Sequence, residues 1–368
     1  MSNYIMVGAD VHDKDILIKA AHNRGNPVQQ TFNNTPGGRE RMIAALQEQA
    51  EEAGNATVVF AYEASFLGFG LYDQMTDARF ECHVLTPTRI ARSSTHRKRK
   101  TDARDAERLL EVIRGHILAG NDLPSIWIPD LQTRDDRELV RMRLDVGKKI
   151  TSIKSQILVL LKRNNFRKPA KTGSNWTKKH RVWLAESAKP ESALPGGARC
   201  AMNSLMRQLE ALEQEIVYLD KHIQDLSGAP RYAEPVQELK KLKGVGTLTA
   251  MAYLTEMGDL SRFNNRRQIG AFLGLVPSSS ESGQKDDRKG HITHQGSGRV
   301  RKVLCQACRS RIRNDPHEKD VYGRIVEHNP KHKNIAVVAS MRRLAIKMWH
   351  QGLKAQSRAG SFEAAVNG

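Results

Sequence analysis

The sequence predicts an α/β domain at the N-terminus and a mainly α-helical remainder, and three observations support this division. Short apolar runs that end in a carboxylate, residues 4–10 and 57–63, alternate with helical patterns over the first 119 residues. Residues 134–161 and 205–226 repeat apolar side chains every three or four positions, as long paired helices do. A glycine-containing turn at residues 243–247 then joins two short helical patterns.

The N-terminal elements follow the order of the ribonuclease H-like fold, which is a hairpin, a strand, a helix, a strand, a helix, a strand and a helix. We expect the five strands to form one mixed sheet, with adjacent central strands. The predicted elements are residues 4–10, 16–21, 30–33, 42–50, 57–63, 67–75, 82–85 and 101–119.

Four carboxylates stand at positions that this fold brings together. Asp10 and Glu63 each end a predicted central strand, while Asp102 and Asp105 lie one helical turn apart at the start of a helix. Converging carboxylates repel one another unless cations are present, and divalent ions that bind phosphate resolve this repulsion. Taken singly, each residue has another interpretation, as a strand-end turn residue or as part of a solvated, mixed-charge helix start.

The net charge of the chain is +19 and its pI is about 9.9, which favours a polyanionic partner. The positive charge is confined to residues 96–190 and 261–368, which carry +12 and +13, whereas the other two segments carry −3 each. Two separate surfaces for phosphate backbones are therefore expected. The first segment opens with the run Arg97, Lys98, Arg99 and Lys100.

A basic insert, residues 162–199, separates the two long helical patterns. Phe166, Trp176 and Trp183 alternate with its cations, as suits nucleic acid whose bases can stack. A disordered tether is the alternative, and we expect the insert to be irregular in either case. The candidate binding cations are Arg163, Arg167, Lys168, Lys178 and Lys179.

Downstream, the turn with Gly244 and Gly246 matches a helix-hairpin-helix element, whose glycines let backbone N–H groups approach a phosphate. A plain helical hairpin is the alternative. A basic helix is predicted at residues 299–313 and a last helix at 335–349. The candidate binding residues here are Gly244, Gly246, Arg288, Lys289, Arg299, Arg301, Lys302, Arg309 and Arg313.

The four cysteines are too few for a disulfide framework in 368 residues, so a reducing compartment is expected. We see no signal peptide and no run that would span a membrane, which predicts a soluble, cytoplasmic, nucleoid-associated protein. His291, His294, Cys305 and Cys308 offer the spacing of a zinc site, but buried helix cysteines explain the last two better.

Together these motifs resemble the DEDD-type transposases of bacterial insertion sequences, a family of bridge-RNA-guided recombinases. The resemblance runs in order from the N-terminus to about residue 315. It rests on residues 8–11, 62–64, 100–106, 244–246, 274–277, 282–283, 290–293 and 296.

The resemblance implies a RuvC-like domain (residues 1–125), a coiled-coil linker (130–228), a transposase domain (229–355) and a tail (356–368). It implies Mg²⁺, in two ions, held by the four carboxylates. It also implies that Ser282 attacks a DNA phosphate to form a phosphoserine link. A structured bridge RNA would pair with double-stranded target and donor DNA, and the protein would act as a homodimer or homotetramer.

Two other functions are compatible with the residues. A metal-dependent endonuclease of the Holliday-junction type would use the carboxylates and leave Ser282 as an ordinary loop residue. A non-catalytic nucleic-acid-binding protein would use only the basic segments.

Overall fold

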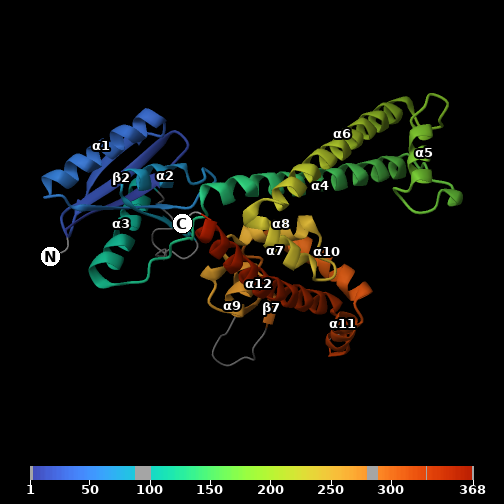
Figure 1. The fold of residues 1–368 in the computed structure, drawn as a ribbon. Helices are drawn as coiled ribbons and strands as arrows, with labels where there is room; N and C mark the ends of the chain where they lie inside the picture. Colours follow the sequence, from blue (N-terminus) through green and yellow to red (C-terminus); the bar gives the residue numbers. More distant parts are fainter. Residues whose placement is uncertain (1–2, 88–100, 280–288, 329, 367–368) are drawn as a thin grey trace. The chain divides into compact units, whose positions relative to one another are not determined.

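A computed structural model describes residues 3–87, 101–279, 289–328 and 330–366. The chain divides into two compact units, Met1–Ile128 and Pro129–Gly368, which are described separately here. Figure 1 shows a sheet with its helices in the first unit and a mainly helical second unit.

The N-terminal unit is built on one five-stranded sheet with the order β3-β2-β1-β4-β5. The first three strands pair antiparallel, whereas β1 pairs parallel with β4, and β4 with β5. This confirms the predicted mixed α/β arrangement. The strands are β1 (Tyr4–Val11), β2 (Asp15–His22), β3 (Val28–Asn33), β4 (Thr57–Glu63) and β5 (Glu81–Leu85).

Alternate residues of the central strands face two different helical layers, because successive side chains of a strand point to opposite faces. Val7 and Phe60 pack in a core with residues of α1 (Pro36–Glu52) and α2 (Gly70–Asp77). Met6 and Val59 pack instead against Leu109, Leu110 and Ile113 of α3 (Asp102–Ala119). The helix α3 therefore covers the other face of the sheet, as Figure 1 shows.

The chain after α3 returns to the edge strand β5. The N–H of Ile126 donates to the carbonyl of Val84 at 2.8 Å, and the N–H of Thr86 donates to the carbonyl of Pro124 at 2.9 Å. Ile126 and Ile128 also pack against the core under α1 and α2. These contacts attach residues 124–128 to the sheet.

The second unit consists of helices and one short hairpin. Three helices, α5, α9 and α11, and the hairpin β6–β7 were not predicted. The elements are α4 (Leu131–Arg163), α5 (Lys178–Ser187), α6 (Gly196–Ser227), α7 (Pro230–Lys240), α8 (Thr247–Met257), α9 (Arg266–Phe272), β6 (Pro277–Ser279), β7 (Lys289–Ile292), α10 (Gly298–Asn314), α11 (Pro316–His328) and α12 (Lys333–Val366).

The helix α12 passes through the segment that the sequence predicted to be a tail. Trp349 of α12 lies in the core of the second unit, and its indole N–H donates to the carbonyl of Leu260 at 3.0 Å. Gln356 lies beyond residue 349, the predicted end of this helix. Its side chain accepts from the N–H of Leu260 at 3.1 Å and donates to the carbonyl of Gly258 at 3.3 Å. These tertiary contacts hold the helix past residue 349, where the sequence analysis placed its end.

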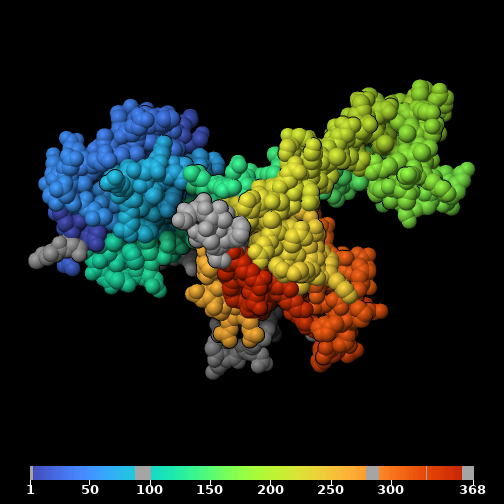
Figure 2. Space-filling model, viewed as in Figure 1, coloured from blue at the N-terminus to red at the C-terminus, as the bar shows by residue number. Residues whose placement is uncertain are grey.

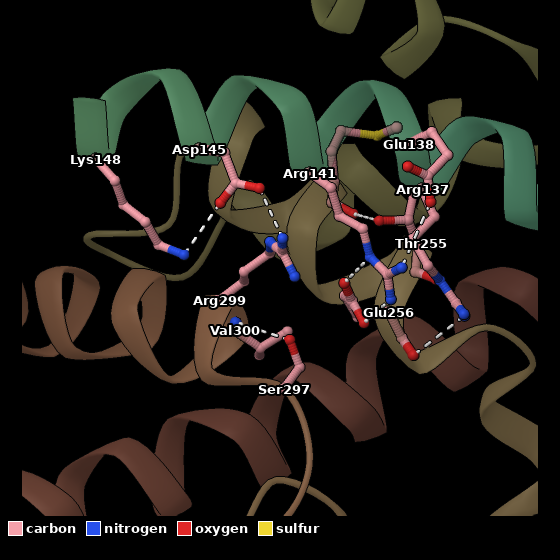
Figure 3. A network of polar contacts seen from close by, with 11 residues as sticks. Arg137, Glu138, Arg141, Asp145, Lys148, Thr255, Glu256, Ser297, Arg299 and Val300 are labelled. Atoms are coloured by element: carbon pink, nitrogen blue, oxygen red, sulfur yellow. Dashed lines mark hydrogen bonds and ion pairs between the residues drawn. The ribbon is translucent and has the colours of Figure 1, made fainter. Parts of the chain in front are cut away.

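The first half of α4 is attached to α8 by paired charges (Figure 3). The guanidinium of Arg141 binds the carboxylate of Glu256 through two hydrogen bonds of 2.8 and 3.2 Å, and Arg137 donates to the carbonyl of Thr255 at 2.9 Å. The second half of α4 pairs with α6, and Ile157 and Leu209 lie in the core between these two helices. Figure 2 shows this pair extending as an arm from the helical body of the same unit.

The basic insert at the end of this arm is not irregular, contrary to the sequence prediction. It contains α5 and the first turn of α6, and its buried Leu184 and Leu194 join a core with Met202 of α6. Phe166, Trp176 and Trp183 pack against this core. The apolar side chains scattered among the cations are sufficient to fold the insert, which rules out a disordered tether for the described residues.

Candidate functional site

Asp10 and Glu63 occupy adjacent positions because they lie at the ends of neighbouring parallel strands. The register pairs Ala9 of β1 with Tyr62 of β4, so the next residue along each strand is the acidic one. Period-two alternation places both carboxylates on the sheet face that carries Met6 and is covered by α3.

Gly8 allows α3 to approach this face closely. A Cβ atom at Gly8 would lie 2.2 Å from the carbonyl oxygen of Ala106 and 2.3 Å from the backbone nitrogen of Leu110. The backbone of α3 thus rests directly on β1, and the first turn of the helix, with Asp102 and Asp105, lies beside Asp10. We call Asp10, Glu63, Asp102 and Asp105 the acidic cluster.

Asp10 and Asp102 share one partner, the imidazole ring of His12. The Nε2 atom of His12 is 3.2 Å from a carboxylate oxygen of Asp10 and 3.4 Å from one of Asp102. These three side chains each offer a ligand atom, and the three atoms lie within 4.8 Å of one another. The side chain of Asp102 is 56% exposed, so the site is open to solvent.

Glu63 and Asp105 are linked by a second cation, Arg108 of the same helix. One guanidinium nitrogen of Arg108 lies 2.5 Å from Glu63, and the other lies 3.6 Å from Asp105. Sequence reasoning missed both His12 and Arg108. The spacing of Arg108, three residues after Asp105 on one helix face, was a usable signal.

The negative charges of the cluster act on one another. Burial raises the pKa of Asp10 above its ordinary value of 3.8, and the charges of Asp102 and Asp105 raise it further against the opposing effect of His12. Burial lowers the pKa of His12, but Asp10 and Asp102 outweigh it and raise that pKa above 6.5. The carboxylate oxygens of the acidic cluster are accessible to solvent, and side-chain cations offset only part of their negative charge. Such oxygen ligands fit a hard divalent cation.

Several predicted residues lie outside the described part of the chain. They are Ser282, Arg97, Lys98, Arg99, Lys100 and Arg288. The strands that flank the serine segment are described, and they pair antiparallel with Pro277 opposite Ile292. The backbone of Lys289 belongs to β7.

Gly244 contacts protein backbone in the turn between α7 and α8. It has a φ of 83°, and a Cβ there would lie 2.6 Å from the carbonyl oxygen of Ala307 in α10. Arg311 of α10 also donates to the carbonyl of Lys243 at 3.2 Å. Close packing of this turn on α10 thus explains Gly244, while no heavy atom lies within 4 Å of a Cβ at Gly246.

The cations of α10 divide into two groups. The guanidinium of Arg299 binds Asp145 of α4 at 2.6 Å (Figure 3), and with Lys148 it lowers the pKa of Asp145 to about 2. Arg301 donates to three backbone carbonyls, among them that of Leu273 at 3.1 Å. By contrast, Arg309 and Arg313 are exposed, and Lys302 is half-buried.

All five candidate cations of the insert are exposed: Arg163, Arg167, Lys168, Lys178 and Lys179. The zinc set that the sequence analysis considered less suitable, His291, His294, Cys305 and Cys308, does not assemble, because the cluster around Asp10 is the one group of three or more metal-ligating side chains among the residues that the structure describes. Burial raises the pKa of Cys308 to about 12, as for an ordinary core thiol. In the same part of the chain, no helix is long and apolar enough to cross a membrane.

The mixed sheet with acidic residues at its strand ends is consistent with a ribonuclease H-like DEDD domain. Two family models match the chain: one described as "Transposase", of the DEDD type, over residues 7–165, and one described as "Transposase IS116/IS110/IS902 family" over residues 236–323. The chain belongs to this family of insertion-sequence transposases.

Curated relatives extend the similarity over most of the chain. A putative transposase of Sinorhizobium fredii is 30% identical over 305 residues, which cover 82% of this chain and 70% of the relative. The transposase for insertion sequence element IS1533 of Leptospira borgpetersenii is 27% identical over 74% of this chain and 75% of its own. The transposase for element IS1111A of Coxiella burnetii is 32% identical over 120 residues, about a third of each chain.

Proposed function

We propose that this transposase cuts and rejoins DNA through a phosphoserine intermediate at Ser282, with Mg²⁺ held by the acidic cluster. The observation that carries the proposal is the convergence of Asp10 and Asp102, each of which has a carboxylate oxygen within 4.8 Å of the other and of a ring nitrogen of His12. Bound Mg²⁺ would neutralise phosphate charge and lower the pKa of a coordinated hydroxyl. The carboxylates are held for this role by β1, β4 and α3, and the family match over residues 7–165 includes all four.

Arg108, and His12 when it is protonated, offset part of the negative charge of the acidic cluster. Each bridges two carboxylates, so that Asp10 with Asp102, and Glu63 with Asp105, share a cation. The binding of Mg²⁺ then requires these side chains to move away or to accept new partners. Arg108 released from Glu63 is able to pair with a phosphate oxygen of DNA.

Ser282 supplies the nucleophile in this proposal. Its Oγ forms a bond to phosphorus, the phosphorus–oxygen bond to the DNA breaks, and a free DNA hydroxyl leaves. The DNA hydroxyl freed in this step later attacks a second phosphoserine, on the exchanged strand, and releases that serine. The phosphoester bond is conserved, so no external energy source is needed.

The same proposal includes guidance by a structured bridge RNA. It also includes a coiled coil formed by α4 and α6, and an oligomeric form of the protein. The resemblance of the motifs supports the RNA, and the two positive segments give it and the DNA separate surfaces. The turn at Gly246, whose α8 N-terminus has no side-chain cap, suits a helix-hairpin-helix contact to a DNA phosphate.

The test is a search for covalent protein–DNA adducts. The full chain is purified with RNA expressed from the flanking element and incubated with Mg²⁺ and end-labelled DNA that carries the element ends. Wild type is compared with Ser282→Ala and Asp102→Asn, and the matched controls are Ser280→Ala in the same segment and the exposed Asp122→Asn. We expect an adduct in wild type and both controls, and none in the two site variants.

The outcomes separate the candidate functions. Free cleavage products that persist unchanged in Ser282→Ala, without any adduct, would remove the serine step and leave a metal-dependent endonuclease. Strand cleavage that survives Asp102→Asn would contradict the role of the acidic cluster. Adduct formation that survives ribonuclease treatment would contradict guidance by RNA.

A further inference from the structure

The end of the α4–α6 arm carries a cleft of about 450 Å³ between α4 and α5, which we call the tip cleft. We propose that the tip cleft binds one unpaired nucleotide of a single-stranded nucleic acid. The base would lie against Phe166 and Trp183, and its phosphate would lie at Lys162 and Arg167. This goes beyond the proposed strand-transfer chemistry, and most of the cleft lies between the spans that the two family models match.

The chain reverses at the end of α4 to build one wall of the cleft. Asn165 has a φ of 50°, the N–H of Asn165 donates to the carbonyl of Lys162 at 3.1 Å, and the N–H of Phe166 donates to the carbonyl of Leu161 at 2.9 Å. This pair of bonds is the Schellman motif, in which the residue after the left-handed one folds back on the last helical turn. Phe166 is thereby fixed beside α4.

Two aromatic rings form the flat part of the wall. The rings of Phe166 and Trp183 stack with their centres 5.7 Å apart and their planes at 22°. Both side chains are only half-buried and both line the cleft, so part of their surface faces it. The ring of Trp183 also packs against that of His180, with 5.6 Å between the ring centres and 31° between the planes. Half-buried aromatic rings that line a basic cleft are the platforms on which proteins stack unpaired bases.

His180 places an unused hydrogen-bond donor in the same wall. The side chain is fully buried, and its Nδ1 accepts the N–H of Trp176 at 3.0 Å. The proton of the neutral ring therefore lies on Nε2, for which no partner exists among the described residues. Burial, Lys168 and Arg181 lower the pKa of His180, which keeps the ring neutral at pH 7.

A buried donor without an acceptor is rare in folded proteins, so it indicates a missing acceptor. Trp176, which provides the opposing N–H, has a φ of 68°, a conformation that a bulky side chain seldom adopts. This orientation of His180 is therefore maintained at a cost to the backbone. A carbonyl oxygen or ring nitrogen of a nucleobase is the kind of acceptor that the donor lacks.

Positive charge and amide groups surround the aromatic wall. Lys162, Arg167 and Lys168 line the cleft, and none of its lining residues, all within the described part of the chain, is acidic. Lys168 is held in place because it donates to the carbonyl of Gly173 and to the side-chain oxygen of Asn175. An anion attached to a flat ring satisfies these cations and the aromatic wall together.

This combination favours a single strand over the alternatives. The bases of a duplex are already stacked and paired, and they offer no face to Trp183. An acidic peptide would satisfy Arg167 and Lys168 but would leave the rings and the donor of His180 unused. The volume also lies in the range of about 300–1,000 Å³ that is usual for small-ligand sites.

The test measures binding to the full chain without Mg²⁺, so that it is independent of strand cleavage and of the proposed function. Labelled oligouridine and oligothymidine are titrated as single strands and, in parallel, as duplexes with their complements. The charge variant is Lys162→Gln with Arg167→Gln. Its matched control is Lys171→Gln with Lys189→Gln, which removes two exposed cations of the insert that do not line the cleft.

We expect the cleft variant to bind single strands about 10-fold or more weakly and to lower the salt slope by about 1.4, or about 0.7 per cation. The control variant should change affinity by no more than about 3-fold. Trp183→Leu should weaken binding about 5- to 150-fold, as the loss of one stacked base does, with an unchanged salt slope. Uridine monophosphate should compete, whereas inorganic phosphate at the same concentration should not.

Equal losses in the cleft and control variants would overturn the proposal, because the end of the arm would then act only through diffuse charge. Equal affinity for duplexes, or competition by inorganic phosphate as strong as by the nucleotide, would also overturn it. Lys162 and Arg167 are exposed, so their variant tests the proposal even if Trp183→Leu fails to fold. The two oligonucleotides show whether the site prefers RNA or DNA.

Discussion

Replacing Gly8 with alanine should disrupt the acidic cluster without touching any carboxylate. The new Cβ would stand 2.2 Å from the carbonyl oxygen of Ala106, whereas ordinary van der Waals contacts begin at 3.4 Å. This oxygen and the backbone nitrogen of Leu110, at 2.3 Å, both belong to the backbone of α3, so the clash cannot be relieved by rotating a side chain. The helix must therefore move by about 1 Å, and Asp102 and Asp105 must move with it.

Two magnitudes follow from this displacement. Overpacking of a well-packed interface typically costs about 1–3 kcal/mol of the free energy of unfolding. A displacement of about 1 Å between catalytic groups costs about 10²-fold in rate. Gly8→Ala should thus lower adduct formation by about two orders of magnitude in protein that remains folded at 25 °C.

The assay combines urea denaturation with the adduct experiment at saturating DNA. The matched control is Gly37→Ala in the first turn of α1, where the nearest atom to a new Cβ is the far end of the Arg41 side chain at 3.7 Å. This variant should be neutral or more stable by up to about 1 kcal/mol. The reasoning would be refuted if Gly8→Ala formed adducts at the wild-type rate with an unchanged urea midpoint.

Two further predictions concern a buried charge and the proposed metal site. Although burial opposes it, hydrogen bonds from Lys347 and Arg311 lower the pKa of Glu318 to about 2, so this carboxylate stabilises the fold above its ordinary pKa of 4.5 and loses that effect as the pH falls towards 2. Glu318→Gln should lower the free energy of unfolding by about 3–5 kcal/mol at pH 7. The difference in urea midpoint between this variant and wild type should shrink between pH 5 and 2, and a pH-independent difference would contradict the reasoning. The control, Glu138→Gln at an exposed position, should lower the free energy of unfolding by less than about 1 kcal/mol. Arg108→Gln removes the cation that competes for Glu63, so Mg²⁺ should raise the melting temperature of this variant more than that of wild type; a smaller rise would show that Arg108 does not compete with the ion.

The acidic cluster was predictable in part because it depends on backbone topology. Strand-end positions follow from apolar runs, and the ends of neighbouring parallel strands must meet, so Asp10 and Glu63 were found from sequence. His12 was not found, because its contacts depend on how one side chain folds back towards Asp102. Gly8 belonged to a recognisable motif, but only the packing of α3 shows why the position excludes a Cβ.

The basic insert shows the opposite limit of sequence reasoning. Charge and aromatic content predicted nucleic-acid contact or a tether, and neither prediction included a folded tip. Local hydrogen bonds at Asn165 and the half-buried pair of Phe166 and Trp183 create an ordered cleft. Composition shows which chemical groups are present. The cleft depends instead on which parts of the aromatic rings remain accessible after the apolar side chains have packed.

The cations of α10 limit what net charge can say about a binding surface. Residues 261–368 carry +13, but Arg299 is neutralised by Asp145 and Arg311 by Glu318, both through short ion pairs inside the unit. Such an arginine connects helices, and its removal should affect the stability of the fold more than the affinity for DNA. The exposed Arg309 and Arg313 remain available to phosphate. Among the described residues of α10, fewer cations are therefore available to phosphate than the net charge of the region indicates.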